Sequence, residues 1–410
     1  MKLPVWISMI AGGAVLSLAS LAATGAPSRL SPQIDRGVQL AKLGDCAMCH
    51  TAPDGAPYAG GRPIQTPFGV VFATNITPDR ETGIGAYTRA QFERALHKGM
   101  RRDGAQLYPA FPYDHFSYAT DGDIDALYAF LMTRRPVAQR PPPNRLIPPL
   151  GFRPIMLIWK ALYFRPQAFT PTPGKSDEWN HGAYLVESFG HCGACHTPHG
   201  ALGAEKTARA FDGGYAEGWY APPLNASTPA SVSWTQQSLY TYLRTGLDAT
   251  HAASAGPMAA VAHELARAPE ADVRAMAVYL ADQMKTPPRS APVDHAAQAA
   301  VQHPVGARLY AGACAVCHEP GAAMMREGRP PLPLGTPLHE DDPRDTIQII
   351  LQGLKPPTGP SGPYMPGFAG AFTDAQVAEI AAYLRSRFSE RPAWVKLPAA
   401  VATARKDAAA

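Results

Sequence analysis

The feature that most constrains this chain is a short motif that occurs three times. The stretches GDCAMCH, GHCGACH and GACAVCH each hold two cysteines separated by two residues, and a histidine directly follows the second cysteine. The chain has 410 residues and six cysteines, so the three motifs use every thiol. The motif residues are Cys46, Cys49 and His50, then Cys192, Cys195 and His196, then Cys314, Cys317 and His318.

Four kinds of chemistry use closely spaced cysteines, and three of them leave something unexplained. A thioredoxin-like thiol pair would explain one such motif but gives the histidine no role. Structural zinc needs four ligands, and each motif supplies three. A disulfide framework would not place a histidine beside every pair. Covalent haem explains each residue, because two thiols bond the two vinyl groups of the porphyrin and the next imidazole binds the iron. The motifs therefore predict three covalently bound haem c groups.

The sequence around each motif is also repeated. A helical pattern that begins with a glycine leads into the first cysteine, and a second helical pattern far downstream closes with an aromatic residue and a leucine. The loops between them are rich in Pro and Gly and show no convincing strand alternation. These patterns predict an all-α fold class with three tandem units joined by Pro-rich loops. The glycines and aromatic residues are Gly37, Gly182, Gly306, Phe130, Tyr279 and Tyr383.

The segments outside the units also carry predictions. Residues 1–26 have a positive start, an apolar run and small residues near their end, which indicates a secretory signal peptide, with an uncleaved membrane anchor as the alternative. Residues 141–174 are predicted to be a Pro-rich linker. Its apolar stretch at 155–164 is either a helix packed on the neighbouring unit or a patch for a partner protein or a membrane surface. The predicted units span 29–140, 175–290 and 300–390, and 391–410 form a C-terminal tail.

An iron that only carries electrons is best closed on its second face, and a methionine there raises the potential. Such a residue should precede the last helix of its unit. Met258 lies twenty-one residues before Tyr279 and Met365 eighteen before Tyr383, both beside Pro and Gly, so we expect them to be the distal iron ligands of the second and third haems.

The first unit departs from this pattern. The same spacing reaches YPAFPYDHF, where Phe111 cannot bind iron. His115 in the same loop is the first candidate for a distal ligand, Met100 is the alternative, and an open or water-ligated iron is the third. For the proximal side, GRP recurs after the first and third motifs, and the loops at Pro63 and Pro330 are predicted to bring a backbone carbonyl to the imidazole.

Longer stretches carry a resemblance to a known family. DCAMCHTAPDGAPYAGGRPIQTPFGVVFATNITPDRETGIG, WNHGAYLVESFGHCGACHTPHG and GPYMPGFAGAFTDAQVAEIAAYLRSRF resemble the three domains of the three-haem cytochrome c subunits of bacterial membrane-bound dehydrogenases, of the alcohol, gluconate, aldehyde or molybdenum-hydroxylase type. The resemblance implies three cytochrome c domains, in which the first glycine permits a close crossing with the aromatic residue of the last helix. It also implies electron flow from a periplasmic dehydrogenase catalytic subunit to ubiquinone or the respiratory chain, at the periplasmic side of the membrane.

The resemblance also bears on the partner. YPAFPYDHF resembles the variant that accompanies molybdenum hydroxylases, which favours that partner over a quinoprotein or a flavoprotein. No nucleotide-binding glycine loop, flavin fingerprint or triad is visible, so no catalytic site is expected in the chain itself. A formal net charge of +4 is too weak to indicate nucleic acid binding. The rival interpretation is a self-sufficient haem enzyme or a gas-binding sensor with an open iron in the first unit.

Overall fold

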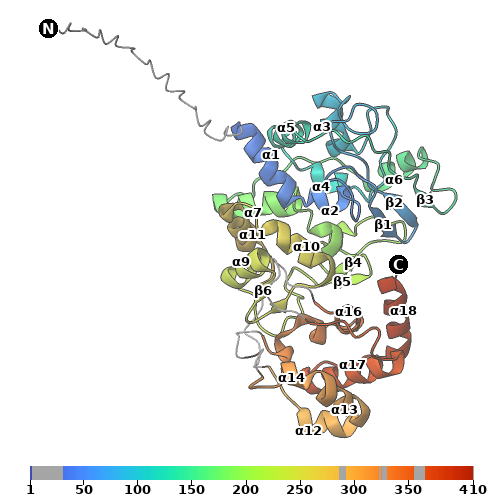
Figure 1. Cartoon of the computed structure of the whole chain (residues 1–410), viewed down its shortest axis with the longest axis vertical. Coiled ribbons are helices and arrows are strands. Elements are labelled where there is room, and N and C mark those ends of the chain that lie inside the picture. The colour runs from blue at the N-terminus through green and yellow to red at the C-terminus, as the bar shows by residue number, and fades with distance from the viewer. Residues whose placement is uncertain (2–30, 286–291, 323–324, 326–329, 355–364, 410) are drawn as a thin grey trace.

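The computed structural model describes residues 1, 31–285, 292–322, 325, 330–354 and 365–409 (Figure 1). The predicted signal peptide therefore lies, apart from its first residue, outside the described residues. The chain is mostly helical, with 47% helix and 8% strand. The predicted helical fold class is thus confirmed in its main part, although the described residues also form three short antiparallel sheets in the Pro- and Gly-rich loops.

Three successive parts of the chain repeat one arrangement of helices, and we call them unit one, unit two and unit three. The elements of unit one are α1 (Pro32–Leu43), α2 (Cys46–His50), β1 (Pro63–Thr66), β2 (Gly69–Phe72), α3 (Arg89–Lys98), α4 (Tyr113–Phe116), α5 (Asp121–Met132), β3 (Arg145–Leu146) and α6 (Ile155–Tyr163). Those of unit two are α7 (Asp177–Glu187), α8 (Gly193–His196), η1 (Thr207–Arg209), β4 (Gly214–Ala216), β5 (Trp219–Ala221), α9 (Gln236–Thr245), β6 (Leu247–Asp248), β7 (Ala252–Ala253), α10 (Gly256–Leu265) and α11 (Glu270–Gln283). Those of unit three are α12 (Ala296–Gln302), α13 (Pro304–Ala313), α14 (Ala315–His318), η2 (Leu332–Leu334), η3 (Thr336–His339), α16 (Arg344–Gln352), α17 (Asp374–Phe388) and α18 (Leu397–Ala409).

In every unit the helix before the motif crosses the last long helix of the repeat, as α1 on α5, α7 on α11 and α13 on α17. A Cβ atom added to the crossing glycine would lie 1.9–2.2 Å from a carbonyl oxygen of the other helix, so no larger residue fits. The predicted close crossing is confirmed, and it holds the motif at a constant place beside the helix pair. The glycine and carbonyl residues are Gly37 with Ala126, Gly182 with Ala275 and Gly306 with Glu379.

Local signals explain where many of these helices begin. In α3 and α17 a threonine accepts a hydrogen bond from the third helical N–H while the glutamine at that position bonds back, which is a capping box. Serine side chains cap α1 and α7 through Ser31 and Ser176. The helix pairs are therefore encoded locally, before any contact between units.

Units one and two share one hydrophobic core, to which α1 and α5 contribute Leu40 and Ile124 and α7 contributes Leu185. Unit three has a separate core, which includes Ile347 and Ile380. Figure 1 shows units one and two stacked against each other, with unit three attached below unit two.

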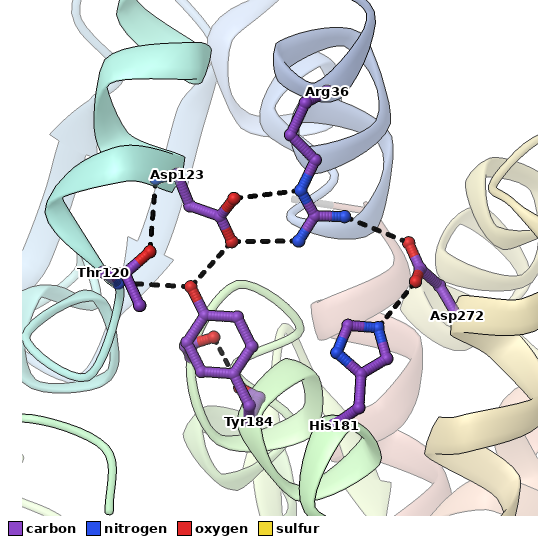
Figure 2. Close-up of polar contacts among 7 residues, drawn as sticks. Arg36, Thr120, Asp123, His181, Tyr184 and Asp272 are labelled. Carbon is purple, nitrogen blue, oxygen red and sulfur yellow. Dashed lines mark hydrogen bonds and ion pairs between the residues drawn. The ribbon is translucent and has the colours of Figure 1, made fainter. Parts of the chain in front are cut away.

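A polar network also joins units one and two (Figure 2). The Arg36 guanidinium donates two hydrogen bonds of 2.9 Å to the carboxylate of Asp123 and one of 3.3 Å to Asp272 of α11. The hydroxyl of Tyr184, in α7, donates to Asp123 at 2.8 Å, and a ring nitrogen of His181 lies 2.7 Å from Asp272. The crossing helices of both units thus meet at one ion cluster.

Two segments that were predicted to lie outside the three units, the linker and the C-terminal tail, are parts of the folded units. In the predicted linker, β3 extends the β1–β2 sheet and α6 packs on unit one. The predicted C-terminal tail forms α18, which places Leu397, Val401 and Ala404 in the core of unit three. The helix at 155–163 packs on the neighbouring unit, which was one of the two alternatives for this stretch. The packing of the C-terminal segment was not predicted, because an Ala-rich end carries weak local signals.

Candidate haem-attachment sites

Each motif forms a short helix at the end of the first crossing helix: α2, α8 and α14. The six cysteines are half-buried free thiols. The first cysteine of each motif packs against a hydrophobic core, Cys46 and Cys192 on the shared one and Cys314 on that of unit three. The arrangement thus presents two thiols one helical turn apart, on the side of the helix pair where the histidine also lies.

The histidines of units one and two are held in one tautomer. Nδ1 of His50 lies 2.6 Å from the carbonyl oxygen of Thr74, and Nδ1 of His196 lies 2.6 Å from that of Pro222. A carbonyl only accepts, so Nδ1 carries the proton and Nε2 keeps a free lone pair. Burial lowers the pKa of both imidazoles, although the bond to the carbonyl raises it. Each ring is therefore a neutral ligand with one free donor nitrogen.

The carbonyls come from an element that the sequence did not reveal. Thr74 follows the β1–β2 hairpin, which begins at Pro63, and Pro222 follows the β4–β5 hairpin. Unit two has the same contact without the GRP stretch, so the hairpin and not the proline supplies the carbonyl. In unit three the GRP stretch lies, except for Pro330, outside the described residues. The predicted backbone carbonyl from the loop at Pro63 is thus confirmed for unit one. Only the fold could identify the residue that supplies it, because a backbone carbonyl has no side-chain signature.

The surroundings of five of the six thiols disfavour the thiolate form, which is the nucleophile. Burial raises the pKa of Cys46, Cys192 and Cys195 to about 12, and that of Cys49 and Cys314 to about 11. Thiol–disulfide enzymes need the opposite shift. This speaks against a thioredoxin-like role and leaves the thiols as attachment points.

The donor set fits covalent haem c: two thiols at fixed spacing and a neutral imidazole with Nε2 free. A second observation agrees. Unit two holds three buried side chains, Ser231, His251 and Ser254, whose polar atoms have no hydrogen-bond partner among the described residues. Haem brings two propionate carboxylates, which are acceptors of the kind that such groups need.

The same backbone hydrogen bond occurs in units one and two at the start of the loop that carries the predicted distal position. Leu107 N–H donates to the carbonyl of Gly99 at 2.8 Å, and Ser254 N–H donates to that of Gly246 at 2.8 Å. Both glycines end a helix with positive φ. Four residues beyond the donors lie Phe111 and Met258, so Phe111 occupies the place where unit two has its methionine.

The other predicted methionines lie near the same kind of turn. Met258 lies in the first turn of α10 and packs, half-buried, against the shared core. Met365 pairs with Leu354 through two backbone hydrogen bonds of 2.9 and 3.0 Å, directly after α16. Met100 follows Gly99 and pairs with Gln106. Its counterparts after the helix-ending glycines of units two and three are the leucines Leu247 and Leu354, which also pair through their backbones.

His115, the first candidate for the distal ligand of unit one, is engaged with unit two. It is 9% exposed, its Nδ1 lies 2.9 Å from the carbonyl oxygen of Glu187, and its Nε2 lies 2.7 Å from the carboxylate of Glu205. Burial lowers the pKa of His115, but the hydrogen bond and charge of Glu205 outweigh it and raise the pKa to about 9. A doubly protonated imidazole between two acceptors has no lone pair for iron. Nothing in the neighbouring residues indicates this, because both partners lie more than seventy residues away.

The motifs of units one and two lie side by side. Arg62 donates to the carbonyl of Met48, in α2, and forms an ion pair of 2.8 Å with Glu217 in the β4–β5 hairpin. The charges that raise the pKa of the Cys195 thiol include Glu217 and the thiol of Cys49, the second cysteine of the first motif.

The β4–β5 hairpin also contacts unit three. The carbonyl of Gly218 accepts from Arg344 and Gln348 of α16, and Tyr220 N–H donates to Asp345 at 2.8 Å. The hairpin that precedes Pro222, the partner of His196, thus contacts both unit one and unit three.

No helix in the described part of the chain has the length and apolarity that a membrane crossing requires.

Comparisons with known proteins identify the family of the chain. Residues 302–384 match the family model "Cytochrome C oxidase, cbb3-type, subunit III". The chain is 42% identical over 395 residues to a nicotinate dehydrogenase subunit of Pseudomonas putida, which covers 95% of this chain but only 33% of that protein, so the chain spans about a third of its length. It is 38% identical to the fructose dehydrogenase cytochrome subunit of Gluconobacter japonicus, over 90% of this chain and 82% of that one. It is 34% identical to the gluconate 2-dehydrogenase cytochrome c subunit of Pantoea cypripedii, over 96% and 93%.

Proposed function

The chain belongs to the cytochrome c subunits of membrane-bound dehydrogenases, and from this premise we propose that it is a three-haem electron carrier. It accepts electrons from a dehydrogenase catalytic subunit and passes them to ubiquinone or the respiratory chain. The observation that carries the proposal is the threefold recurrence of a CxxCH helix beside a glycine-crossed helix pair. The proposed cytochrome c domains are residues 29–163, 175–290 and 300–409, the first extended by β3 and α6 and the last by α18.

In this proposal the motif residues hold the groups. The six cysteines attach three haem c groups, and His50, His196 and His318 bind iron on the proximal side. Haem c supplies a one-electron couple at its iron. The hairpin carbonyls of Thr74 and Pro222 hold the proton on Nδ1, so that two of the three imidazoles always present Nε2. The hydrophobic cores cover the side of each motif on which its first cysteine packs.

For the distal side we propose Met258 and Met365 as ligands of the second and third irons. In unit one Phe111 lies in the corresponding place, and both nitrogens of His115 are taken. Met100 is the remaining candidate ligand, and without it the first iron is open. An open iron is also what a gas-binding sensor would need, so this loop is the one feature that favours the rival function.

The proposed electron path follows the order of the units. The motifs of units one and two are adjacent, and the β4–β5 hairpin connects the second site to unit three. With the two motifs as neighbours, an electron would pass between the groups that they hold without a further carrier. For the donor we propose a molybdenum hydroxylase, supported by YPAFPYDHF and by the similarity to a nicotinate dehydrogenase subunit. The proposed location is the periplasmic side of the membrane, after export by residues 1–26.

Haem counting tests the proposal. Protein made with the haem-attachment machinery should carry three haems that survive denaturation, seen by mass spectrometry and by the pyridine haemochrome spectrum. It should oxidise no alcohol, aldehyde or sugar acid alone, and should be reduced when its dehydrogenase and substrate are added. Fewer than three haems, or substrate oxidation by the chain alone, would refute the assignment.

Carbon monoxide tests the distal side. If Met100 binds the first iron, reduced protein stays free of carbon monoxide and Met100→Ala gains one adduct. If the first iron is open, one adduct forms at once and Phe111→Met reduces it. Two or three adducts in the unchanged protein would contradict the assignment of Met258 and Met365.

A further inference from the structure

Helix α6 turns its apolar side to solvent and its charged residue into the protein, which is the reverse of most surface helices. Met156 and Lys160 are its buried residues, whereas Leu157, Ile158 and Leu162 are 55%, 64% and 63% exposed. At 100° per residue these three side chains occupy one arc, and the remaining residue of that arc is Ala161, also exposed. The solvent-facing side of the helix therefore carries no charge at all.

The one charged side chain of the helix points into the protein. Lys160 Nζ donates to the carbonyls of Lys98 and Gly99 at 2.6 and 2.7 Å and to the side-chain oxygen of Gln106 at 2.8 Å. Burial lowers the pKa of Lys160 to about 8. These bonds fix the rotation of α6, so the apolar arc cannot turn inward without breaking all three.

Neighbouring loops extend the apolar surface. Ile147 and Phe152 precede α6 and are 54% and 68% exposed. Trp159 donates its indole N–H to the carbonyl of Leu202, which is 55% exposed, and so brings a loop of unit two beside the helix. We call Ile147, Phe152, Leu157, Ile158, Leu162 and Leu202 the α6 patch. Figure 1 shows α6 and β3 at the outer edge of unit one.

The chain segment that contains the α6 patch, apart from Leu202, carries charges of one sign along the sequence. Residues 126–176 contain no Asp or Glu. Eight cationic residues fall in that range: Arg134, Arg135, Arg140, Arg145, Arg153, Lys160, Arg165 and Lys175. In the part of the chain that the structure describes, Arg135, Arg140, Arg145 and Arg165 are exposed, and none of them is in an ion pair. An apolar surface that shares a chain segment with unpaired exposed cations suits an acceptor that is apolar inside and anionic at its surface.

We propose that the α6 patch docks this protein on a membrane that contains anionic phospholipid, with α6 lying in the plane of the headgroups. A helix of nine residues is about 14 Å long, less than half of a hydrocarbon core of about 30 Å, so it lies on the membrane and does not cross it. Lys160 is bonded to Gly99 and Gln106, which precede the loop that carries Phe111, so docking would bring this part of unit one towards the membrane. The inference rests on the proposed function for its setting, and adds the surface that makes the contact.

Vesicle flotation of the haem-loaded protein tests this proposal. The probes are vesicles of phosphatidylcholine alone and vesicles with added phosphatidylglycerol. Binding should require phosphatidylglycerol and weaken as salt is raised, because each cation near the surface contributes. The double variant Leu157→Glu, Leu162→Glu should lower the partition coefficient at least about tenfold. The matched control is Val301→Glu on α12, also a charge placed at an exposed apolar helix position, 83% exposed, which should bind as the unchanged protein does.

The outcomes separate this proposal from the proposed function. Reduction of the haems by the dehydrogenase and its substrate in detergent solution should be the same for the double variant and the unchanged protein. Vesicle binding that the double variant retains overturns the docking surface. So does a double variant that no longer binds the dehydrogenase in solution, because the α6 patch would then be a protein interface. Loss of electron transfer in the unchanged protein would instead refute the function.

Discussion

Units one and two on one side, and unit three on the other, use the same helix crossing and the same motif in different ways. The first two units bury their helix pairs in one shared core, and neither has a core of its own. Unit three closes its core with a helix of its own, α18. Units that share a motif therefore need not fold independently of one another, because the surface around the helix crossing decides whether a unit folds alone.

The ion networks show the same contrast. Arg36 reaches from α1 to Asp123 of its own unit and to Asp272 of the next. In unit three Arg387 holds Asp294 and Glu319, which both belong to that unit, at 2.7 and 2.6 Å. Similar chemistry joins two units in the first case and closes one unit in the second.

Loss of a haem should give the largest effect and should spread differently in the two regions. Cys195→Ala removes the second haem from the shared core, so we expect faster hydrogen exchange in both units one and two, and a loss of folded protein. Cys317→Ala should affect unit three alone. Hydrogen exchange resolved by peptide, with haem content measured in parallel, checks this. Unchanged exchange in unit one of Cys195→Ala would break the comparison.

The next effect concerns pH and the bridge between His115 and Glu205. The folded pKa of His115 is about 9, against 6.5 when free. Its contribution is therefore complete below pH 6.5 and disappears as pH rises through 9, and it amounts to about 3 kcal/mol at most. Denaturant unfolding at pH 6 and pH 9.5 should show this loss for units one and two. His115→Gln should remove the pH dependence, and a variant that keeps it would rule out the bridge as its cause.

Breaking the Arg36 network should destabilise units one and two somewhat less. Removing one partner of a fully buried ion pair costs about 3–5 kcal/mol, and Arg36→Ala should cost about 2 kcal/mol because its side chain is 27% exposed. The control is Arg274→Ala, whose pair with Glu270 lies on the surface of α11 and should give no measurable change. Equal unfolding midpoints for the two variants would show that the network does not join the units.

The contact between units two and three should give the smallest effect. Tyr215 is 57% exposed and donates to Asp342 at 2.6 Å. Tyr215→Phe should cost about 0.5 kcal/mol or less. It should leave all three haem sites intact and increase hydrogen exchange only near the β4–β5 hairpin and the start of α16. A global loss of stability would mean that unit three depends on unit two for folding.

The site could be predicted from sequence where it is local. The spacing of cysteine and histidine, the glycine needed at the helix crossing and the caps that begin the helices are all set within a few residues. The sequence also predicted that Phe111 lies where unit two has Met258, because this follows from the spacing along one loop. These features depend on neighbours in the chain, so their signals lie in the sequence itself.

Other features were decided by contacts between distant segments. The carbonyls that orient His50 and His196 come from hairpins more than twenty residues away. His115 meets Glu205 only because α4 packs on unit two, and α18 becomes core only because unit three leaves a face open. The sequence by itself thus determined which donor groups each unit carries and at what spacing. The tertiary structure decided which units fold together and which side chains remain free to bind, because burial and pairing are properties of surfaces that meet only in the folded chain.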